Sequence, residues 1–222
     1  MCGRYYIDDE TSLEIKKILE SIDKRFQKKE RKTGEIYPAD QAPILVAKNQ
    51  VVEPMVLKWG AEGFDKGRRI INARSESIHE KNMFRHSILH RRCIIPANGF
   101  YEWNRLGNKS KYYFSDYNHD IIYMAGIYDK YQGVDCFIIL TTSANNSMKE
   151  IHERMPLILN KEQMESWLFD DKYTDYLLNL TPMDLKKEEI PKEEKQIIGL
   201  QNHGMQNEIE NEYQQLKFDF LK

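Results

Sequence analysis

Cys2 is the residue of this sequence with the most distinctive potential chemistry. A small residue at position 2 normally permits removal of the initiator methionine, which would leave Cys2 with a free α-amine beside its thiol. The pKa values of these groups are about 7.7–8.0 and about 8.5, so both can act as nucleophiles near neutral pH. Such a 1,2-aminothiol condenses with an aldehyde to an imine, and the sulfur then closes a thiazolidine ring. By position alone, a chance cysteine at a frayed chain end is the commoner explanation.

Two further residues are suited to proton transfer. Glu102 lies between aromatic residues in the stretch NGFYEW, and a carboxyl group in an apolar setting has a raised pKa and can act as general acid or base. His152 could shuttle protons near neutral pH. For Glu102 a solvent-facing strand position is the alternative, and for His152 a structural, hydrogen-bonded ring.

Polar side chains suited to binding a phosphate, a carbonyl group or an amine occur at three more positions. Asn72 and Arg74 alternate in an extended segment, so they are expected on one face of a strand. Arginine suits bidentate phosphate contacts and asparagine can hold a carbonyl or an amine, while Arg4 brings charge close to Cys2. An ordinary surface salt bridge is the alternative for each arginine. His86 and His90, four residues apart, have no third ligand nearby, so no metal site and no cofactor are predicted.

Composition limits the class of protein. The chain has 222 residues, 41% of them hydrophobic and 31% charged, which allows a packed core. A net charge of −2 means that nucleic acid would have to bind through a local basic patch. Three cysteines without a CxxC pair favour neither a disulfide framework nor a zinc ribbon, and no apolar run approaches the ~20 residues of a membrane span. A monomer in a reducing cytoplasm is predicted.

The pattern of the chain predicts one α+β domain with a mixed, largely antiparallel sheet or barrel-like core flanked by helices. A capping box at 11–14 opens the first helix. Further helices are expected around 83–90 and at 161–169, and strands at 42–47, 51–57, 70–74, 93–96, 99–103, 111–114, 121–127, 136–142 and 155–159. The charged segment 186–195 is expected to be a solvated connection. The predicted domain covers 1–206, with an appended tail at 207–222.

Five short blocks, taken in order, resemble the SOS response-associated peptidase (SRAP) family, whose members process abasic sites. These blocks are MCGRY at 1–5, WG at 59–60, NARSE at 72–76, RCIIPANGFYEW at 92–103 and HERMPL at 152–157. The resemblance runs from residue 2 to about residue 170, with weaker agreement to about 206. The sequence departs from the family pattern at Tyr37-Pro38-Ala39-Asp40 and at Gly63-Phe64, where many members have a tryptophan pair.

The resemblance implies a role for each of these residues. Cys2 would be the nucleophile that forms a thiazolidine crosslink with the aldehyde of an abasic site in single-stranded DNA, which shields the lesion. Asn72, Glu102 and His152 would be its catalytic partners. The family's DNA-binding positions fall on Arg4 and Arg74, for phosphate, and on Trp59, for base stacking. The family also implies lyase chemistry and a proposed peptidase activity.

Alternatives remain open at this point. One is a thiol peptidase limited to autocatalytic removal of Met1, and another is a non-covalent single-stranded DNA-binding module. At the C-terminus, the segment containing Gln215, Leu216, Phe218 and Phe220 resembles peptides that dock on the replication sliding clamp. A terminal element packing on its own domain is the competing explanation for that segment.

Overall fold

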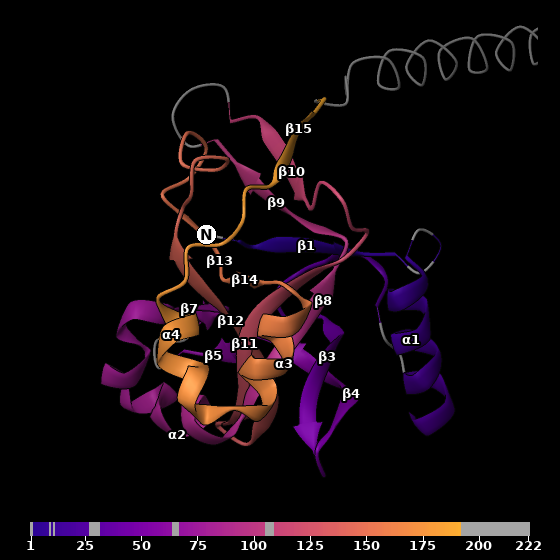
Figure 1. The fold of residues 1–222 in the computed structure, drawn as a ribbon, viewed down its shortest axis with the longest axis vertical. Coiled ribbons are helices and arrows are strands. Elements are labelled where there is room, and N and C mark those ends of the chain that lie inside the picture. Colours follow the sequence, from indigo (N-terminus) through magenta and orange to yellow (C-terminus); the bar gives the residue numbers. More distant parts are fainter. Residues whose placement is uncertain are drawn as a thin grey trace, which may run out of the picture. The chain divides into compact units, whose positions relative to one another are not determined.

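The computed structural model describes residues 2–8, 10, 12–26, 32–63, 67–104 and 109–191. Residues 1–190 form one compact unit. Its architecture is α+β, as predicted: strands form a barrel-like core and a few helices pack on it (Figure 1). The predicted boundary at residue 206 and the tail at 207–222 lie outside the described residues. Within those residues, no helix is long and apolar enough to cross a membrane.

The core is an eight-stranded sheet that closes on itself. Strand β12 pairs with both β4 and β11, and β4, β3, β8 and β11 pair in that order, so these five strands complete a ring. The pairings are antiparallel except where β12 meets β4 and β7. The strands are β3 (Gln41–Lys48), β4 (Val51–Trp59), β7 (Asn72–Arg74), β8 (Arg92–Ala97), β11 (Ile122–Tyr131), β12 (Val134–Ser143), β13 (Arg154–Pro156) and β14 (Ile158–Leu159).

A second sheet of five strands carries the N-terminus. Its order is β15 (Lys186–Ile190), β10 (Lys111–Ser115), β9 (Gly99–Trp103), β1 (Arg4–Ile7) and β2 (Gly34–Ile36), all antiparallel. Strand β8 leads directly into β9, so the barrel and this sheet share a continuous chain segment. A short hairpin of β5 (Ala61–Glu62) and β6 (Arg69–Ile70) follows β4.

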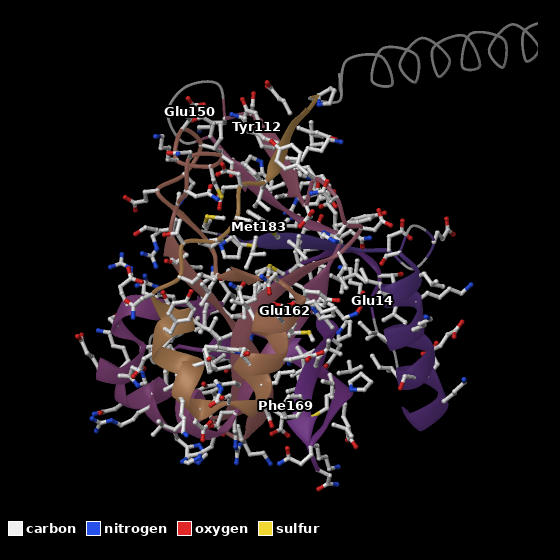
Figure 2. The ribbon with its side chains drawn as sticks, in the orientation of Figure 1. Glu14, Tyr112, Glu150, Glu162, Phe169 and Met183 are labelled. Carbon is white, nitrogen blue, oxygen red and sulfur yellow. The ribbon has the colours of Figure 1, made fainter. Side chains whose placement is uncertain are left out.

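The helices cover the barrel. Helix α1 (Leu13–Phe26) packs on β4, α2 (Asn82–His90) on β11, and α3 (Lys161–Phe169) on β8. Shorter helical turns are η1 (Ser75–Glu80), η2 (Asp171–Tyr173) and α4 (Thr174–Leu178). Figure 2 draws the side chains on the same ribbon, with Glu14 on α1 and Glu162 on α3.

Local signals explain several element ends. Ser12 caps α1, since its Oγ accepts from the Ile15 N–H at 3.3 Å, whereas Thr11 lies outside the described residues. Asn160 and Gln163 form a reciprocal capping box at α3. The β3–β4 hairpin turns through Asn49 and Gln50, whose φ angles of 52° and 62° suit a two-residue turn between paired strands.

The prediction for the charged segment 186–195 was wrong over its first half. Residues 186–190 form β15, which pairs along its length with β10. The side chains of this edge strand are mostly exposed, so its lysines and glutamates remain solvated while the backbone completes the ladder. The prediction relied on the high charge of the segment, and an exposed edge strand of this kind has no apolar face that would distinguish it from a connection.

Candidate functional site

Cys2 and Asn72 are in direct contact although 70 positions separate them. The Asn72 side-chain amide donates to the carbonyl oxygen of Cys2 at 2.8 Å. The thiol of Cys2 donates to the carbonyl oxygen of Arg4 at 3.7 Å, and the residue is completely buried. The other side-chain atom of Asn72, Oδ1, is buried and has no hydrogen-bond partner among the described residues. A buried acceptor of this kind, next to Cys2, is available for a donor that arrives with a ligand.

Strand β7 is held in place from two sides. The carbonyl oxygen of Ile71 accepts from the Ile139 N–H at 3.1 Å and from the indole N–H of Trp59 at 3.1 Å. Gly60, at φ +87°, allows the chain after Trp59 to approach Ile71 closely, because a Cβ at this position would lie 2.7 Å from Ile71 Cγ2. These contacts fix the residue immediately before Asn72, and so fix the direction of the asparagine.

Trp59 cannot stack on a base in this conformation. It is completely buried, its ring lies edge-on to Tyr5 with the centroids 5.0 Å apart, and it stacks on Phe137 at 6.5 Å. The prediction of a stacking role therefore does not fit the structure. Instead, the tryptophan supports the strand that carries Asn72. Phe64, in the neighbouring loop, lies outside the described residues.

Glu102 lies beside Cys2 and is nearly buried, at 5% exposure. Strands β1 and β9 are antiparallel with Arg4 opposite Tyr101, so the chain before Arg4 runs toward Glu102. One oxygen of its carboxylate accepts from the Trp103 N–H at 3.3 Å. The alternation of β9 turns Glu102 to the same face as the buried Phe100.

Burial, together with the smaller effect of the negative charge of Glu102, raises the pKa of the Cys2 thiol to about 12. The hydrogen bond to the Arg4 backbone and the positive N-terminal charge act in the opposite direction. Hardly any thiolate therefore exists at neutral pH while Met1 precedes Cys2. A reaction that starts at this thiol would need a base to take its proton, and Glu102 is the carboxylate whose charge acts on it.

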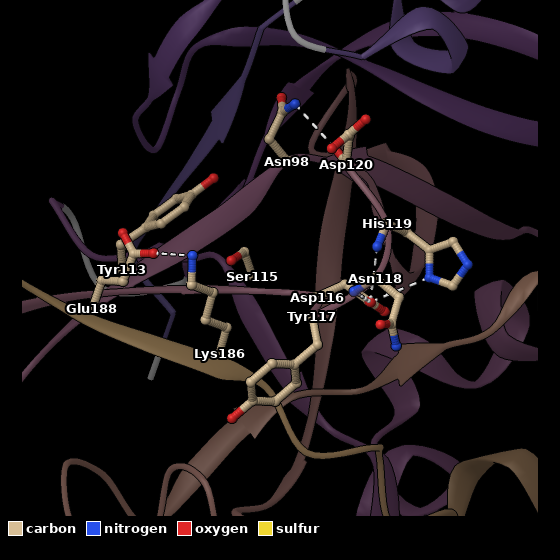
Figure 3. Close-up of a pocket in the computed structure, with 10 residues that line it drawn as sticks. All are labelled: Asn98, Tyr113, Ser115, Asp116, Tyr117, Asn118, His119, Asp120, Lys186 and Glu188. Carbon is tan, nitrogen blue, oxygen red and sulfur yellow. Dashed lines mark hydrogen bonds and ion pairs between the residues drawn. The ribbon is translucent and has the colours of Figure 1, made fainter.

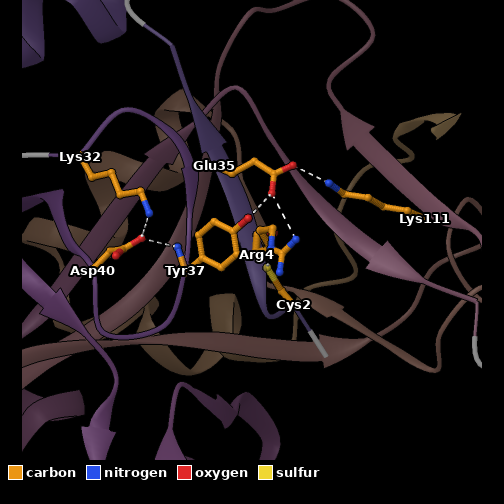
Figure 4. A network of polar contacts seen from close by, with 7 residues as sticks. All are labelled: Cys2, Arg4, Lys32, Glu35, Tyr37, Asp40 and Lys111. Carbon is orange, nitrogen blue, oxygen red and sulfur yellow. Dashed lines mark hydrogen bonds and ion pairs between the residues drawn. The ribbon is translucent and has the colours of Figure 1, made fainter. Parts of the chain in front are cut away.

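Arg4 is held by a carboxylate and two rings rather than standing free for phosphate, and Figure 4 shows it with Glu35 and Tyr37. Its guanidinium donates to Glu35 at 3.2 Å and lies over the rings of Tyr37 and Trp103, at 4.0 Å and 5.1 Å from their centroids. Lys111 also binds Glu35. Burial acts to raise the pKa of Glu35, but the bonds from Lys111 and Tyr37 outweigh it and hold this pKa below its usual value. Tyr37, in the segment that departs from the family pattern, thus contacts a predicted site residue.

His152 lies in the turn before β13 and is 5% exposed. Its Nδ1 accepts from the backbone N–H of Arg154 at 2.9 Å. The Arg154 side chain in turn binds Glu76 through both terminal nitrogens. Both Glu76 and Arg154 belong to the blocks that carry the family resemblance, but nothing in the sequence indicated that they pair.

Arg74 is exposed and lines a groove of about 750 Å³ beside β7. The groove also contains Asn72, Lys81 and polar or apolar residues, and none of its lining residues is acidic. Asn72 therefore contacts Cys2 and lines the groove at the same time. Lys81, which the sequence analysis did not single out, adds a second cation. A polyanion would be attracted here despite the net negative charge of the chain.

A second pocket, of about 380 Å³, has the opposite character (Figure 3). Its lining includes Asp116, Asp120 and Glu188, with Lys186 bound to Glu188 at 2.5 Å and His119 to Asp116 at 3.2 Å. Carboxylates repel phosphate, so this pocket does not suit DNA. Of the two pockets, the groove at Arg74 is the one compatible with a nucleic acid.

The two histidines of α2 lie together, with ring centroids 5.2 Å apart. His86 contacts Asp129 at 3.0 Å, and this carboxylate also binds Arg91 and the hydroxyl of Ser87. Its oxygens are thus engaged by protein donors. Within the described ranges, no group of three potential ligands could hold a metal ion.

The fold and site together define an α+β barrel protein with a buried cysteine at position 2, joined through Asn72 to a groove without acidic residues. The sequence model described as "SOS response associated peptidase (SRAP)" matches residues 1–193, and the chain belongs to this family. Its members include proteins that process abasic sites in DNA, so the family role is lesion processing.

Two relatives show the extent of the similarity. Abasic site processing protein YoaM of Bacillus subtilis is 41% identical over 138 residues, which cover 56% of this chain and 60% of YoaM. Abasic site processing protein YedK of Escherichia coli is 27% identical over 177 residues, or 76% of this chain and 79% of YedK. The matched region thus spans about 60% of the length of YoaM.

A crystal structure of a Bacteroides thetaiotaomicron protein has the same fold. It superimposes with a TM-score of 0.69 at 26% identity, covering 86% of this chain and 93% of that protein. A Bordetella bronchiseptica protein superimposes with a TM-score of 0.67 at 21% identity, and so supports the fold alone.

Proposed function

We propose that this protein binds abasic sites in single-stranded DNA and forms a covalent thiazolidine crosslink through Cys2 after Met1 has been removed. The observation that carries the proposal is the position of Asn72, which binds the Cys2 carbonyl and lines the groove without acidic residues. In this proposal the protein acts as a monomer on DNA in the cytoplasm during the SOS response, and the crosslink shields the lesion.

The chemistry begins at the α-amine of Cys2. The amine attacks the open-chain aldehyde of the abasic sugar, and loss of water gives an imine. The sulfur then adds to the imine carbon, while the thiol proton passes to a base and a proton is taken up by the nitrogen. Overall, aldehyde and aminothiol give a thiazolidine and one water. An α-amine has an ordinary pKa of about 7.7–8.0, so part of it is unprotonated near neutral pH and it is proposed to react first.

Glu102 is proposed as the base that takes the thiol proton, because its charge acts directly on Cys2. His152 accepts a hydrogen bond at Nδ1, so the neutral ring carries its proton on Nε2 and can donate it to a sugar oxygen. Asn72 Oδ1 is proposed to receive the α-amine. Arg4 and Arg74 are proposed to contact the flanking phosphates, and Arg4 must then share its guanidinium with Glu35.

The first test mixes the protein with single-stranded DNA that carries one abasic site. A band of retarded DNA on a denaturing gel is expected, and DNA without the abasic site should give none. If abasic DNA incubated with the wild-type protein migrates on the gel like DNA without protein, the proposal fails.

Groove cations are expected to control the salt dependence of non-covalent binding. Each of Arg74→Ala and Lys81→Ala should weaken binding of single-stranded DNA and reduce the slope of log K against log salt by about 0.7, the value for one lost contact. Fluorescence anisotropy at several salt concentrations measures this slope. Lys48→Ala is the control, since Lys48 lies on the β3–β4 hairpin with a side chain 62% exposed. Equal slopes for all three variants would remove the groove from the proposal.

Two other activities are secondary proposals. An imine intermediate also permits strand cleavage, so a lyase activity on the same lesion is proposed. Autocatalytic removal of Met1 would require the Cys2 thiol to attack at neutral pH, and burial and the charge of Glu102 oppose ionisation of that thiol. We therefore place the peptidase below the crosslinking function.

The segment containing Gln215, Leu216, Phe218 and Phe220 lies outside the described residues, and docking on the sliding clamp remains a proposal. A peptide covering residues 213–222 should bind the purified clamp in a titration followed by anisotropy. The same peptide with Leu216, Phe218 and Phe220 changed to alanine is the control. Equal binding of both peptides, or of neither, would remove the clamp as a partner.

A further inference from the structure

We propose that Glu76 and Arg154 form an ion pair, called the clamp below, that holds His152 in a fixed position relative to the strand of Asn72. Both would be positioning residues for crosslinking. This inference rests on the function proposed above. It assigns a role to an ion pair that joins two of the blocks which carry the family resemblance.

The clamp has a fixed geometry. Arg154, on β13, has a side chain only 9% exposed. Its Nη1 binds Glu76 Oε1, and its Nη2 donates to Glu76 Oε2 at 2.8 Å and to the Thr141 carbonyl oxygen at 2.6 Å. Two parallel bonds between guanidinium and carboxylate fix the planes of both groups. The hydrogen bonds from Arg154 lower the pKa of Glu76, so the carboxylate stays ionised at neutral pH.

One end of the clamp holds the histidine. The backbone N–H of Arg154 donates to His152 Nδ1 at 2.9 Å, so anchoring the arginine side chain also anchors the peptide group that sets the ring. A ring that accepts at Nδ1 carries its proton on Nε2 in the neutral form. If the clamp is lost, His152 is no longer fixed in one ring orientation or in one tautomer.

The other end holds the strand of Asn72. Glu76 follows β7 by two residues, and Thr141 stands opposite Arg74 in the parallel pairing of β12 with β7. The hydroxyl of Thr141 donates to the Ala73 carbonyl oxygen at 3.3 Å. One network therefore reaches from His152 through Arg154 to Glu76 and, through Thr141, to Ala73, which is next to Asn72.

A stabilising role alone would not require an ion pair here, because the Glu76 side chain is 48% exposed and ion pairs open to solvent contribute little to stability. Positioning predicts a different result from stability. If Glu76 acts through His152, then losing Glu76 should matter only while His152 is present.

The test is a double-mutant cycle of Glu76→Gln and His152→Ala, measured as single-turnover crosslinking to abasic single-stranded DNA. Glu76→Gln alone should lower the saturating rate by about 10-fold to 100-fold, the upper value being the cost of a misplacement of about 1 Å, with the half-saturating DNA concentration changed by less than about two-fold. In the His152→Ala background the same change should have an effect below about two-fold. Asp135→Asn, which removes an exposed ion pair with Lys130, is the control and should leave the rate unchanged.

Arg154→Lys provides a second arm, because it keeps the charge but loses the two-pronged contact. In the wild-type background, Arg154→Lys should lower the crosslinking rate as much as Glu76→Gln does. In the His152→Ala background, it should cause no further loss of rate. The inference would be overturned if these substitutions lowered the crosslinking rate by the same factor in both backgrounds. It would also be overturned if the His152→Ala variant crosslinked at the wild-type rate. Wild-type protein without any adduct would instead refute the proposed function itself.

Discussion

Replacing Cys2 by alanine is expected to abolish the covalent band with abasic single-stranded DNA. Alanine retains the α-amine but lacks the sulfur, so the reaction would stop at an imine that hydrolyses under denaturing conditions. The proposed product is stable because ring closure by sulfur removes the C=N bond. Denaturing electrophoresis of wild type and Cys2→Ala after equal incubation measures the difference.

Cys2→Ser serves as the matched control for ring closure. Serine keeps a hydroxyl in the position of the thiol and, like alanine, can form the imine. Reduction with borohydride should therefore trap a covalent adduct for both variants, although neither should give a lasting band without it. An undiminished band for Cys2→Ala in the absence of borohydride would show that another residue forms the crosslink.

The second large effect is expected for Glu102→Gln, with crosslinking slowed about 100-fold or more, a typical loss for a general base. Two consequences of this change have opposite signs. The negative charge of Glu102 raises the pKa of the Cys2 thiol, so its removal lowers that pKa and increases the thiolate fraction at every pH. It also removes the proposed acceptor of the thiol proton. Because the second effect is the one required by the mechanism, the rate should fall even though the thiol becomes more acidic.

Both quantities can be measured on the same variant. The pH dependence of alkylation at Cys2, followed in the N-terminal peptide by mass spectrometry, should shift to lower pH in Glu102→Gln. Single-turnover crosslinking gives the rate. A faster reaction than wild type would mean that Glu102 acts only through its charge. Mass spectrometry of Glu102→Ala adds a test of the peptidase alternative, since retained Met1 in this variant alone would support self-processing.

The sequence predicted those elements whose residues form an apolar run or an apolar face. The hairpin of β3 and β4, the helix at Lys161–Phe169 and the strands around Ile122–Tyr131 have apolar faces that require burial. Strand β15 lacks such a face, and its pairing depends on the exposed edge of β10, which no local pattern encodes. Barrel closure through β12 likewise depends on contacts between distant segments.

The site was predicted by position, and its contacts were not. The ordered blocks singled out Cys2 and Asn72, but residue types alone could not show a hydrogen bond across 70 positions. Trp59 illustrates the limit most clearly, because a tryptophan suits base stacking and core packing equally well and only the packing on Tyr5 and Phe137 decides. The salt bridge of Arg4 with Glu35 could not be foreseen for the same reason.

Mass spectrometry of the crosslinked peptide is the most direct test of the covalent function. After nuclease and trypsin digestion of the adduct, the modified peptide should be Cys2-Gly3-Arg4 without Met1. Its mass should exceed that of the free peptide by the mass of the abasic fragment that the nuclease leaves, minus one water. Fragmentation should place the added mass on Cys2. An adduct on a lysine, or on a peptide that retains Met1, would contradict the aminothiol mechanism.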